Sequence, residues 1–129
     1  MSLLCQVYRS SRRQEMYLYV DKARGLLDVP DTLLAQFGDP APVMLLHLTP
    51  QHKLARADVA LVLASIQTQG FYLQINAASA ADVDAAAARI KAAGGALLSE
   101  PSDRPWGVRM FQFNDLDGFK LGVSTPLAG

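Results

Sequence analysis

The 129-residue chain has a single cysteine, Cys5, and therefore cannot form an internal disulfide. A lone cysteine within an apolar stretch indicates a reducing compartment. No apolar run approaches the roughly 18 residues that span a membrane, and the first residues lack the basic start, apolar core and cleavage site of a signal peptide. We therefore expect a cytoplasmic protein that does not enter a membrane.

The chain also lacks net charge, because 12 lysines and arginines balance 12 acidic residues. Neither half departs far from neutrality, which argues against strong electrostatic binding of nucleic acid. Half of the residues are hydrophobic and 19% are charged, a composition typical of a folded globular chain. Its length fits one domain or two very small ones.

The first half of the chain predicts alternating strands and helices. Apolar runs, polar breaks and helix-ending glycines give the order strand, strand, helix, strand, helix, strand. The predicted elements cover residues 3–9, 16–20, 30–37, 43–48, 58–69 and 71–75. The first two strands form a hairpin with Arg12 and Arg13 at its tip, and Asp28 is expected to cap the first helix. The run 43–48 is almost continuously apolar, which is typical of a central strand covered on both faces.

The second half predicts one more helix followed by strands. Ser79 and Asp82 have the spacing of a capping box, and the helix that they start ends at Gly94-Gly95. Strands are predicted at residues 96–99, 108–113 and 119–123, with a tight turn between the last two. The fold class predicted for the whole chain is α+β.

Several blocks of the first half resemble one family of small bacterial proteins, the YcgL-domain family. The matching blocks are Cys5-x-Val7-Tyr8-Arg9-Ser10, Met16-Tyr17-Leu18-Tyr19-Val20, Val29-Pro30, Phe37-Gly38, Lys53-Leu54-Ala55-Arg56-x-Asp58-Val59 and Gly70-Phe71-Tyr72-Leu73-Gln74. The resemblance covers residues 3–75 and implies no established catalytic site. Genes of this family often neighbour that of ribonuclease D, which implies a role in support of RNA processing.

Residues 70–127 resemble one βαβββ module of the vicinal oxygen chelate superfamily, which includes glyoxalases and bleomycin-resistance proteins. The matching run is Asp82-Val83-Asp84-Ala85-Ala86, Gly94-Gly95, Glu100-Pro101-x-Asp103-x-Pro105-Trp106-Gly107-Val108-Arg109 and Asp115-x-Asp117-Gly118. Metalloenzymes of the superfamily carry a carboxylate on the last strand, where this chain has Gly122, and the strand 71–75 offers no histidine or glutamate. The resemblance therefore implies a metal-free, ligand-sequestering member without a cofactor.

Together the two resemblances predict a YcgL-like β-β-α-β-α-β unit, residues 1–75, that continues into a glyoxalase-like module, residues 76–129. We expect strand 71–75 to serve both, since no linker separates them. The superfamily closes the open face of such a module with a second module. We therefore expect either a homodimer through the C-terminal sheet or closure by the N-terminal unit.

Four residues of the second half are candidates for a ligand site. Trp106, Phe111 and Phe113 offer aromatic surface for a small aromatic or amphipathic molecule, and Arg109 offers a positive charge. Arg109, Phe111 and Phe113 share one face of their strand, because alternate residues point the same way. The alternative interpretation is that these side chains pack the core or an interface between subunits.

A second candidate surface lies in the first half and contains only basic residues. It comprises Arg9, Arg12, Arg13, Lys53 and Arg56, with tyrosines close by in the sequence. Such a surface can contact RNA phosphates and stack bases, or bind an RNA-processing enzyme. The alternative is an ordinary solvated face.

The remaining polar candidates predict no chemistry. Asp115 and Asp117 precede a glycine and are expected to bind their own turn, and the spacing of His47 and His52 fits no helical metal pair. Cys5 is expected to be a buried structural thiol. We therefore predict a non-catalytic, metal-free protein that binds a small molecule. Two alternatives remain open: an adaptor that supports RNA processing, and a hybrid chain with no evolved activity.

Overall fold

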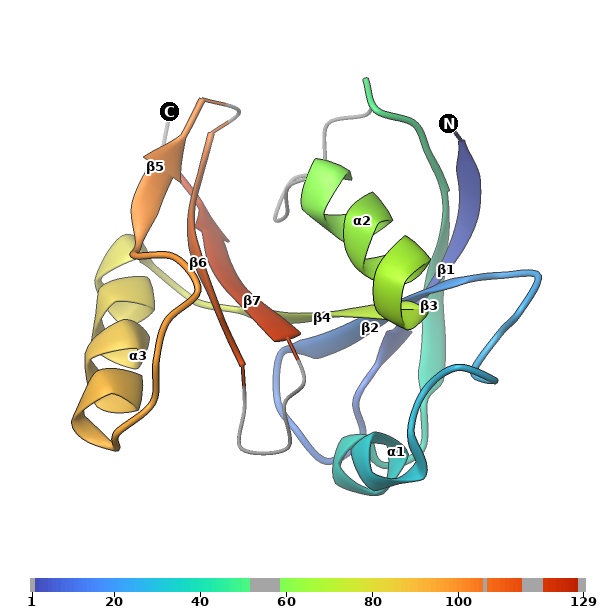
Figure 1. Ribbon diagram of the computed structural model, residues 1–129, viewed down its shortest axis with the longest axis horizontal. Helices are drawn as coiled ribbons and strands as arrows, with labels where there is room; N and C mark the ends of the chain where they lie inside the picture. The colour runs from blue at the N-terminus through green and yellow to red at the C-terminus, as the bar shows by residue number, and fades with distance from the viewer. Residues whose placement is uncertain (1, 52–58, 106, 115–119, 128–129) are drawn as a thin grey trace. The chain divides into compact units, whose positions relative to one another are not determined.

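The computed structural model describes residues 2–51, 59–105, 107–114 and 120–127 (Figure 1). The chain divides into two compact units. Of the described residues, the first unit contains 2–51 and 59–73, and the second contains 74–105, 107–114 and 120–127. Strands and helices are both present, so the predicted α+β class is confirmed.

The first unit has the predicted order of strands and helices. Its elements are β1 (Leu3–Arg9), β2 (Met16–Asp21), α1 (Asp31–Phe37), β3 (Ala41–Leu48), α2 (Val59–Gln69) and the start of β4 (Phe71–Asn76). The strands lie in the order β3-β1-β2-β4, and β1 is antiparallel to both β2 and β3. Buried side chains of this unit include Val7, Leu18, Phe37 and Tyr72.

The loop of the β1–β2 hairpin is fixed to the end of α1 by Ser10. The Ser10 hydroxyl donates to the carbonyl oxygen of Phe37 at 2.5 Å and accepts from the backbone N–H groups of Arg12 and Arg13. Gly38 follows α1 with φ of 80° and ψ of −157°, a backbone conformation that only glycine adopts without strain. A Cβ at this position would collide with Ser11 and Arg12.

The expected cap of α1 is wrong. The N-cap residue is Pro30, and no side chain caps the helix. Asp28 instead accepts from the guanidinium of Arg24, at 2.5 Å from Nε and 2.9 Å from Nη2. The hydrogen bond from Arg24 lowers the pKa of Asp28 below its usual range. A carboxylate with a charged donor four residues away has less reason to bind a backbone N–H.

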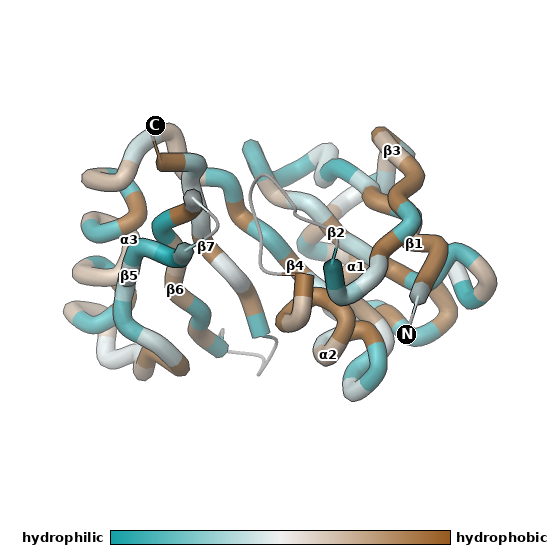
Figure 2. The backbone as a smooth tube through the Cα atoms, turned by 90° about the horizontal axis from the view of Figure 1, so that it is seen from above, coloured by the Kyte–Doolittle hydropathy of each residue, from teal (hydrophilic) through white to brown (hydrophobic). Residues whose placement is uncertain are grey.

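Strand β3 was expected to be central and covered on both faces, and this prediction is wrong. It lies at the end of the strand order, and Val43, Met44 and Leu45 are 39%, 49% and 48% exposed. Apolar segments run along β3 in the hydropathy colouring of Figure 2. A continuous apolar run has no periodicity that distinguishes a covered strand from an exposed edge.

The second unit has the predicted βαβββ order. It contains the end of β4, then α3 (Ala80–Ala92), β5 (Ser102–Arg104), β6 (Val108–Asn114) and β7 (Lys120–Pro126), with the strands in the order β4-β7-β6-β5. Strand β6 is antiparallel to both β5 and β7. The strand expected at residues 96–99 is reduced to an isolated bridge between Leu97 and Phe113. Here the N–H groups of Leu98 and Ser99 both donate to the carbonyl of Gln112, so the chain crosses β6 without forming a ladder.

Helix α3 covers one face of this sheet. Ser79 caps the helix as predicted, because its hydroxyl accepts from the N–H of Asp82 at 3.2 Å. Val83 and Ala87 of α3 pack against Phe111 and Val123 in the buried core of the unit. The helix therefore covers the face of β6 that carries the odd-numbered residues, among which are three of the four predicted ligand residues, Arg109, Phe111 and Phe113.

Candidate functional site

Three of the four predicted ligand residues lie on β6, and Trp106 lies outside the described residues. Arg109, Phe111 and Phe113 point to the same face of the strand, as the alternation predicted. Arg109 contacts Asp84 of α3, and Phe111 and Phe113 pack in the core beneath the same helix. The structure places these residues in three different environments rather than around one cavity.

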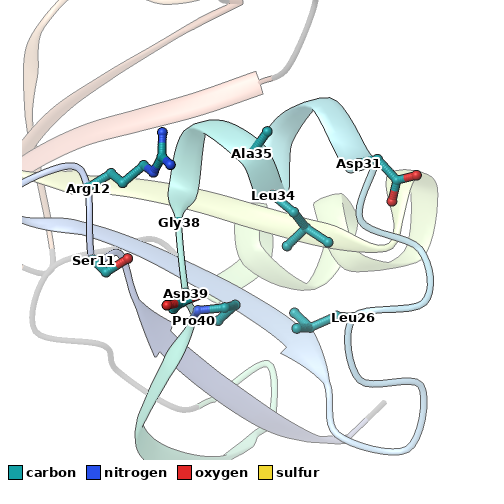
Figure 3. Close-up of a pocket in the computed structure, with 9 residues that line it drawn as sticks. All are labelled: Ser11, Arg12, Leu26, Asp31, Leu34, Ala35, Gly38, Asp39 and Pro40. Carbon is teal, nitrogen blue, oxygen red and sulfur yellow. The ribbon is translucent and has the colours of Figure 1, made fainter.

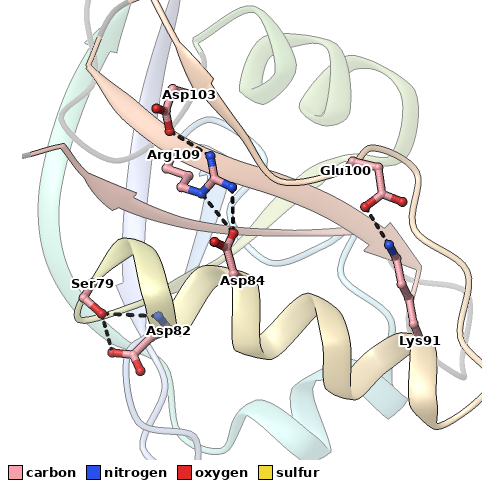
Figure 4. A network of polar contacts seen from close by, with 7 residues as sticks. All are labelled: Ser79, Asp82, Asp84, Lys91, Glu100, Asp103 and Arg109. Atoms are coloured by element: carbon pink, nitrogen blue, oxygen red, sulfur yellow. Dashed lines mark hydrogen bonds and ion pairs between the residues drawn. The ribbon is translucent and has the colours of Figure 1, made fainter.

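Arg109 is held by two carboxylates (Figure 4). Its Nε and Nη2 donate to Oδ1 of Asp84 at 2.9 and 2.8 Å, and its Nη1 donates to Oδ1 of Asp103 at 2.9 Å. The hydrogen bonds that Arg109 donates to Asp103 and Asp84 raise the pKa of Arg109 further above its already high value. The guanidinium therefore joins α3 to β5 and β6, and its charge is already balanced.

Phe111 is part of the core of the second unit. Its side chain is fully buried among Val83, Ala87 and Val123. Its ring centroid lies 5.9 Å from that of Phe113, within the range of favourable aromatic pairs. A side chain so enclosed positions Phe113 and leaves no surface of its own for a ligand.

Phe113 lines an open cavity of about 340 Å³ beneath the C-terminal half of α3. The walls combine apolar side chains of the helix and sheet with a single charged residue; they are Ile75, Ala86, Arg89, Ile90, Ala93, Phe113 and Val123. Arg89 has no ion-pair partner among residues 2–51, 59–105, 107–114 and 120–127. The cavity thus offers an apolar, partly aromatic wall and an unneutralised guanidinium.

Sequence reasoning missed Arg89 and the helical wall of this cavity. The signal was present as small residues one turn on either side of Arg89 and Ile90, namely Ala86 within α3 and Ala93 at its C-cap. Alanines in such positions leave space between a helix and a sheet that larger side chains would fill.

A second cavity of the same unit, also about 340 Å³, lies beside Arg109. Its charged residues are paired with one another: Arg109 with Asp84, and Lys91 with Glu100 at 2.7 Å. A ligand with a charged group would have to displace one of these ion pairs. The cavity beside Phe113 imposes no such cost.

The first unit contains a larger cavity of about 520 Å³, where the hairpin loop meets α1 (Figure 3). Arg12 of the predicted basic surface lies at this cavity, together with Asp31, Asp39 and the apolar side chains of Leu26 and Leu34. Arg9 and Arg13 are exposed and do not line it. Lys53 and Arg56 lie outside the described residues. The two aspartates leave the cavity with mixed charge rather than a basic surface.

The other polar candidates are placed as follows. Within the described part of the chain, no three histidine, cysteine, aspartate or glutamate side chains gather in a way that would hold a metal ion. His47 is exposed on β3, whereas His52, Asp115 and Asp117 lie outside the described residues. Cys5 is a buried thiol, as predicted, and this burial raises the pKa of the thiol to about 12. None of the helices in the described residues is long and apolar enough to cross a membrane.

The described residues thus form a small α+β chain with a four-stranded first unit and a βαβββ second unit. The YcgL domain matches residues 5–77, and the chain belongs to the YcgL domain family. A YcgL domain-containing protein of Chromohalobacter salexigens is 57% identical over 72 residues, which cover 56% of this chain and 75% of the relative. One of Pseudomonas aeruginosa is 55% identical over 75 residues, 58% of this chain and 77% of the relative. A third, from Cellvibrio japonicus, is 44% identical over 85 residues, which cover 66% of this chain and 87% of the relative.

Among solved structures, the chain is similar to a protein of Nocardioides. The crystal structure of a glyoxalase/bleomycin resistance protein/dioxygenase from Nocardioides is 19% identical, with a TM-score of 0.42, and the match covers 95% of this chain and 69% of that one. We infer no ligand and no activity from this likeness.

Proposed function

We propose that this chain is a non-catalytic, metal-free protein that binds a small apolar or aromatic molecule carrying an anionic group. The ligand occupies the cavity beside Phe113, with its ring against Phe113 and Ile90 and its anion at Arg89. The observation that carries the proposal is the chemistry of this cavity, which is apolar apart from one guanidinium that has no acidic partner among the residues that the structure describes.

The size of the cavity supports a ligand of one or two fused rings. Its volume of about 340 Å³ lies near the lower end of the roughly 300–1,000 Å³ found for small-molecule sites. Such sites are typically apolar with a few polar groups that fix the orientation of the ligand. Arg89 supplies one such group, because a guanidinium binds a carboxylate with two parallel hydrogen bonds.

Arg109 serves the proposed site only indirectly. Its ion pairs with Asp84 and Asp103 hold α3 on the sheet, and α3 carries Ala86 and Arg89, the residues that form the helical wall. The predicted anion-binding residue is thereby replaced by Arg89, and the proposed ligand class stays as the sequence suggested.

Titration calorimetry with two probes tests the proposal. The probes are 2-naphthoate and the uncharged 2-naphthalenemethanol, which share the ring and differ in the anion. We expect 2-naphthoate to bind more tightly than 2-naphthalenemethanol by about 1 kcal/mol of binding free energy, as for a partly exposed ion pair. Arg89→Gln should remove this difference in affinity. Arg13→Gln, at an exposed arginine of the first unit, is the matched control and should leave both affinities unchanged.

A cavity-filling variant tests the location. Ala86→Phe places a ring in the cavity and should weaken 2-naphthoate binding at least tenfold. Ala85→Phe adds the same ring at an exposed neighbouring position of α3 and should leave the affinity unchanged. Equal binding by wild-type protein and Ala86→Phe, or no binding by either, contradicts the proposal.

A further inference from the structure

Strand β3 is an apolar edge strand that is exposed on both sides. Leu4 of β1 lies opposite His47, and Gln6 opposite Leu45, so Leu4 and Leu45 lie on one face of the sheet. They are 45% and 48% exposed. Met44, on the other face, is 49% exposed. Large apolar side chains therefore flank this edge above and below.

The backbone of β1 divides its hydrogen bonds between its two neighbours. The N–H of Lys22 donates to the carbonyl of Leu4, and the N–H of Ser10 donates to that of Met16, both at 2.9 Å. Hydrogen-bonded pairs in an antiparallel ladder recur at every second residue. The even-numbered residues of β1 therefore direct their backbone N–H and C=O groups toward β2. The odd-numbered residues, Cys5 among them, direct their backbone N–H and C=O groups toward β3.

The same alternation determines which groups of β3 point outward. Leu46 lies opposite Cys5 and therefore directs its N–H and C=O toward β1. Its neighbours Leu45 and His47 direct theirs away from β1. In the described part of the chain, no strand lies on that side of β3. Two N–H and two C=O groups are thus left at the edge in the geometry of a ladder.

From Met44 to Leu48, β3 carries none of the devices that usually prevent pairing between molecules. Natural edge strands are short, charged or interrupted by bulges and prolines. Strand β5, at the end of the order in the second unit, fits this rule, since it has three residues, including Asp103 and Arg104. Strand β3 has eight residues without a lysine, arginine or carboxylate, and both its bulge and Pro42 lie near its first residues.

We propose that β3 pairs antiparallel with β3 of a second copy of this chain, around a two-fold axis that places Leu46 opposite Leu46 of the second copy. In this register Leu45 of each copy lies opposite His47 of the other. The N–H and C=O groups of these residues then form four hydrogen bonds, so that every outward-facing group of Leu45 and His47 is used.

The side chains favour the same register. On one face Leu45 packs beside the imidazole of His47, close to the exposed side chain of Leu4. On the other face Leu46 meets its equivalent, and Met44 lies opposite Leu48 of the second copy. No two like charges are opposed, because residues 41–48 contain no lysine, arginine, aspartate or glutamate.

A second copy fits this edge better than an unrelated strand. Two-fold pairing is self-complementary, and such dimers are the commonest assemblies of soluble proteins. It also converts the exposed edge of each copy into an interior strand, so the pairing closes at two chains and does not propagate through β3. An unrelated strand would satisfy the same backbone groups but would need a matching apolar pattern of its own.

Sedimentation equilibrium of the full chain tests the dimer. We expect a mass of twice 13.9 kDa for the wild-type protein, and at least a tenfold increase in the dissociation constant for Leu45→Lys. Leu98→Lys makes the same change at a side chain with the same 48% exposure in the second unit and should leave the dimer intact. A monomer at all concentrations up to hundreds of micromolar, or a dimer that Leu45→Lys does not weaken, overturns the proposal.

A cross-link tests the register and does not depend on the folding of a charged variant. In a Cys5→Ala background, Leu46→Cys places two thiols opposite each other at a spacing that a disulfide spans, and most of the protein should become a covalent dimer on oxidation. Met44→Cys in the same background lies opposite Leu48 and should stay uncoupled. Efficient coupling of Met44→Cys, or none of Leu46→Cys, overturns the register.

Discussion

The carboxylate of Asp84 binds the guanidinium of Arg109 through two nitrogen atoms, at 2.8 and 2.9 Å from one oxygen. This contact joins α3 to β6 in the second unit. Asp103 of β5 accepts a third hydrogen bond from the same guanidinium. An arginine with two carboxylate partners gains little from a further anion. The guanidinium at the cavity beside Phe113 is that of Arg89, which forms no ion pair within the described part of the chain.

Replacing Arg109 with glutamine should therefore lower stability and spare ligand binding. The ion pairs are partly exposed to water, so we expect the free energy of unfolding to fall by about 1 kcal/mol. Urea denaturation at low and high salt measures the effect, which should shrink in high salt because exposed charges are screened. Arg13→Gln is the control. A loss of 2-naphthoate affinity without any loss of stability would show that Arg109 itself contacts the ligand.

Cys5 should make the folded state less stable at alkaline pH. Burial raises the pKa of its thiol from 9.0 to about 12, so between these values the unfolded chain loses a proton that the folded chain retains. The contribution of Cys5 to stability is complete below pH 9 and is lost as the pH rises toward 12.

Chemical denaturation from pH 8 to 11 measures this effect in wild-type protein and Cys5→Ala. Because other groups titrate in both proteins, the difference between the two isolates Cys5. The wild-type free energy of unfolding should fall more steeply above pH 9, by up to about 1.4 kcal/mol for each pH unit. Parallel curves for the two proteins would contradict the assignment of a buried neutral thiol.

Gly38→Ala should destabilise the first unit more than an alanine at another glycine with positive φ. A Cβ at Gly38 meets Ser11 and Arg12, whereas a Cβ at Gly25, with φ of 58°, meets nothing within 4 Å. Backbone strain of order 1–3 kcal/mol and the contact with the hairpin loop both act at Gly38, whereas only backbone strain acts at Gly25, so we expect the larger loss for Gly38→Ala. Thermal unfolding of both variants measures the difference, and equal losses would mean that the loop moves aside without cost.

The sequence predicted the elements of the fold better than their surroundings. Periodicity and caps located α3 and its start at Ser79, because these signals depend on neighbours along the chain. The exposure of β3 was not predictable, since an apolar run does not specify what lies on either side of a strand. Asp28 likewise has the right residue type for a cap, but Arg24 binds it instead.

The candidate site was predictable only in part for the same reason. Strand alternation correctly placed Arg109, Phe111 and Phe113 on one face. Which of them lines a cavity depends on α3, which covers Phe111 with Val83 and Ala87. Helix α3 also supplies one carboxylate partner of Arg109, Asp84, and β5 supplies the other, Asp103. A local pattern carries no information on such partners. Arg89 was missed because the small residues around it, Ala86 and Ala93, indicate open space only once the sheet beneath α3 is known.

The most direct test of the proposed ligand site is the nuclear magnetic resonance spectrum of the full chain titrated with 2-naphthoate. We expect shifts of the Ala86, Ile90 and Ile75 methyl groups and intermolecular contacts between the naphthalene ring protons and Ile90. Methyl groups of Leu26 and Leu34, at the cavity of the first unit, should not move. Shifts confined to Leu26 and Leu34, or no shift at Ile90 at saturating probe, would contradict the account.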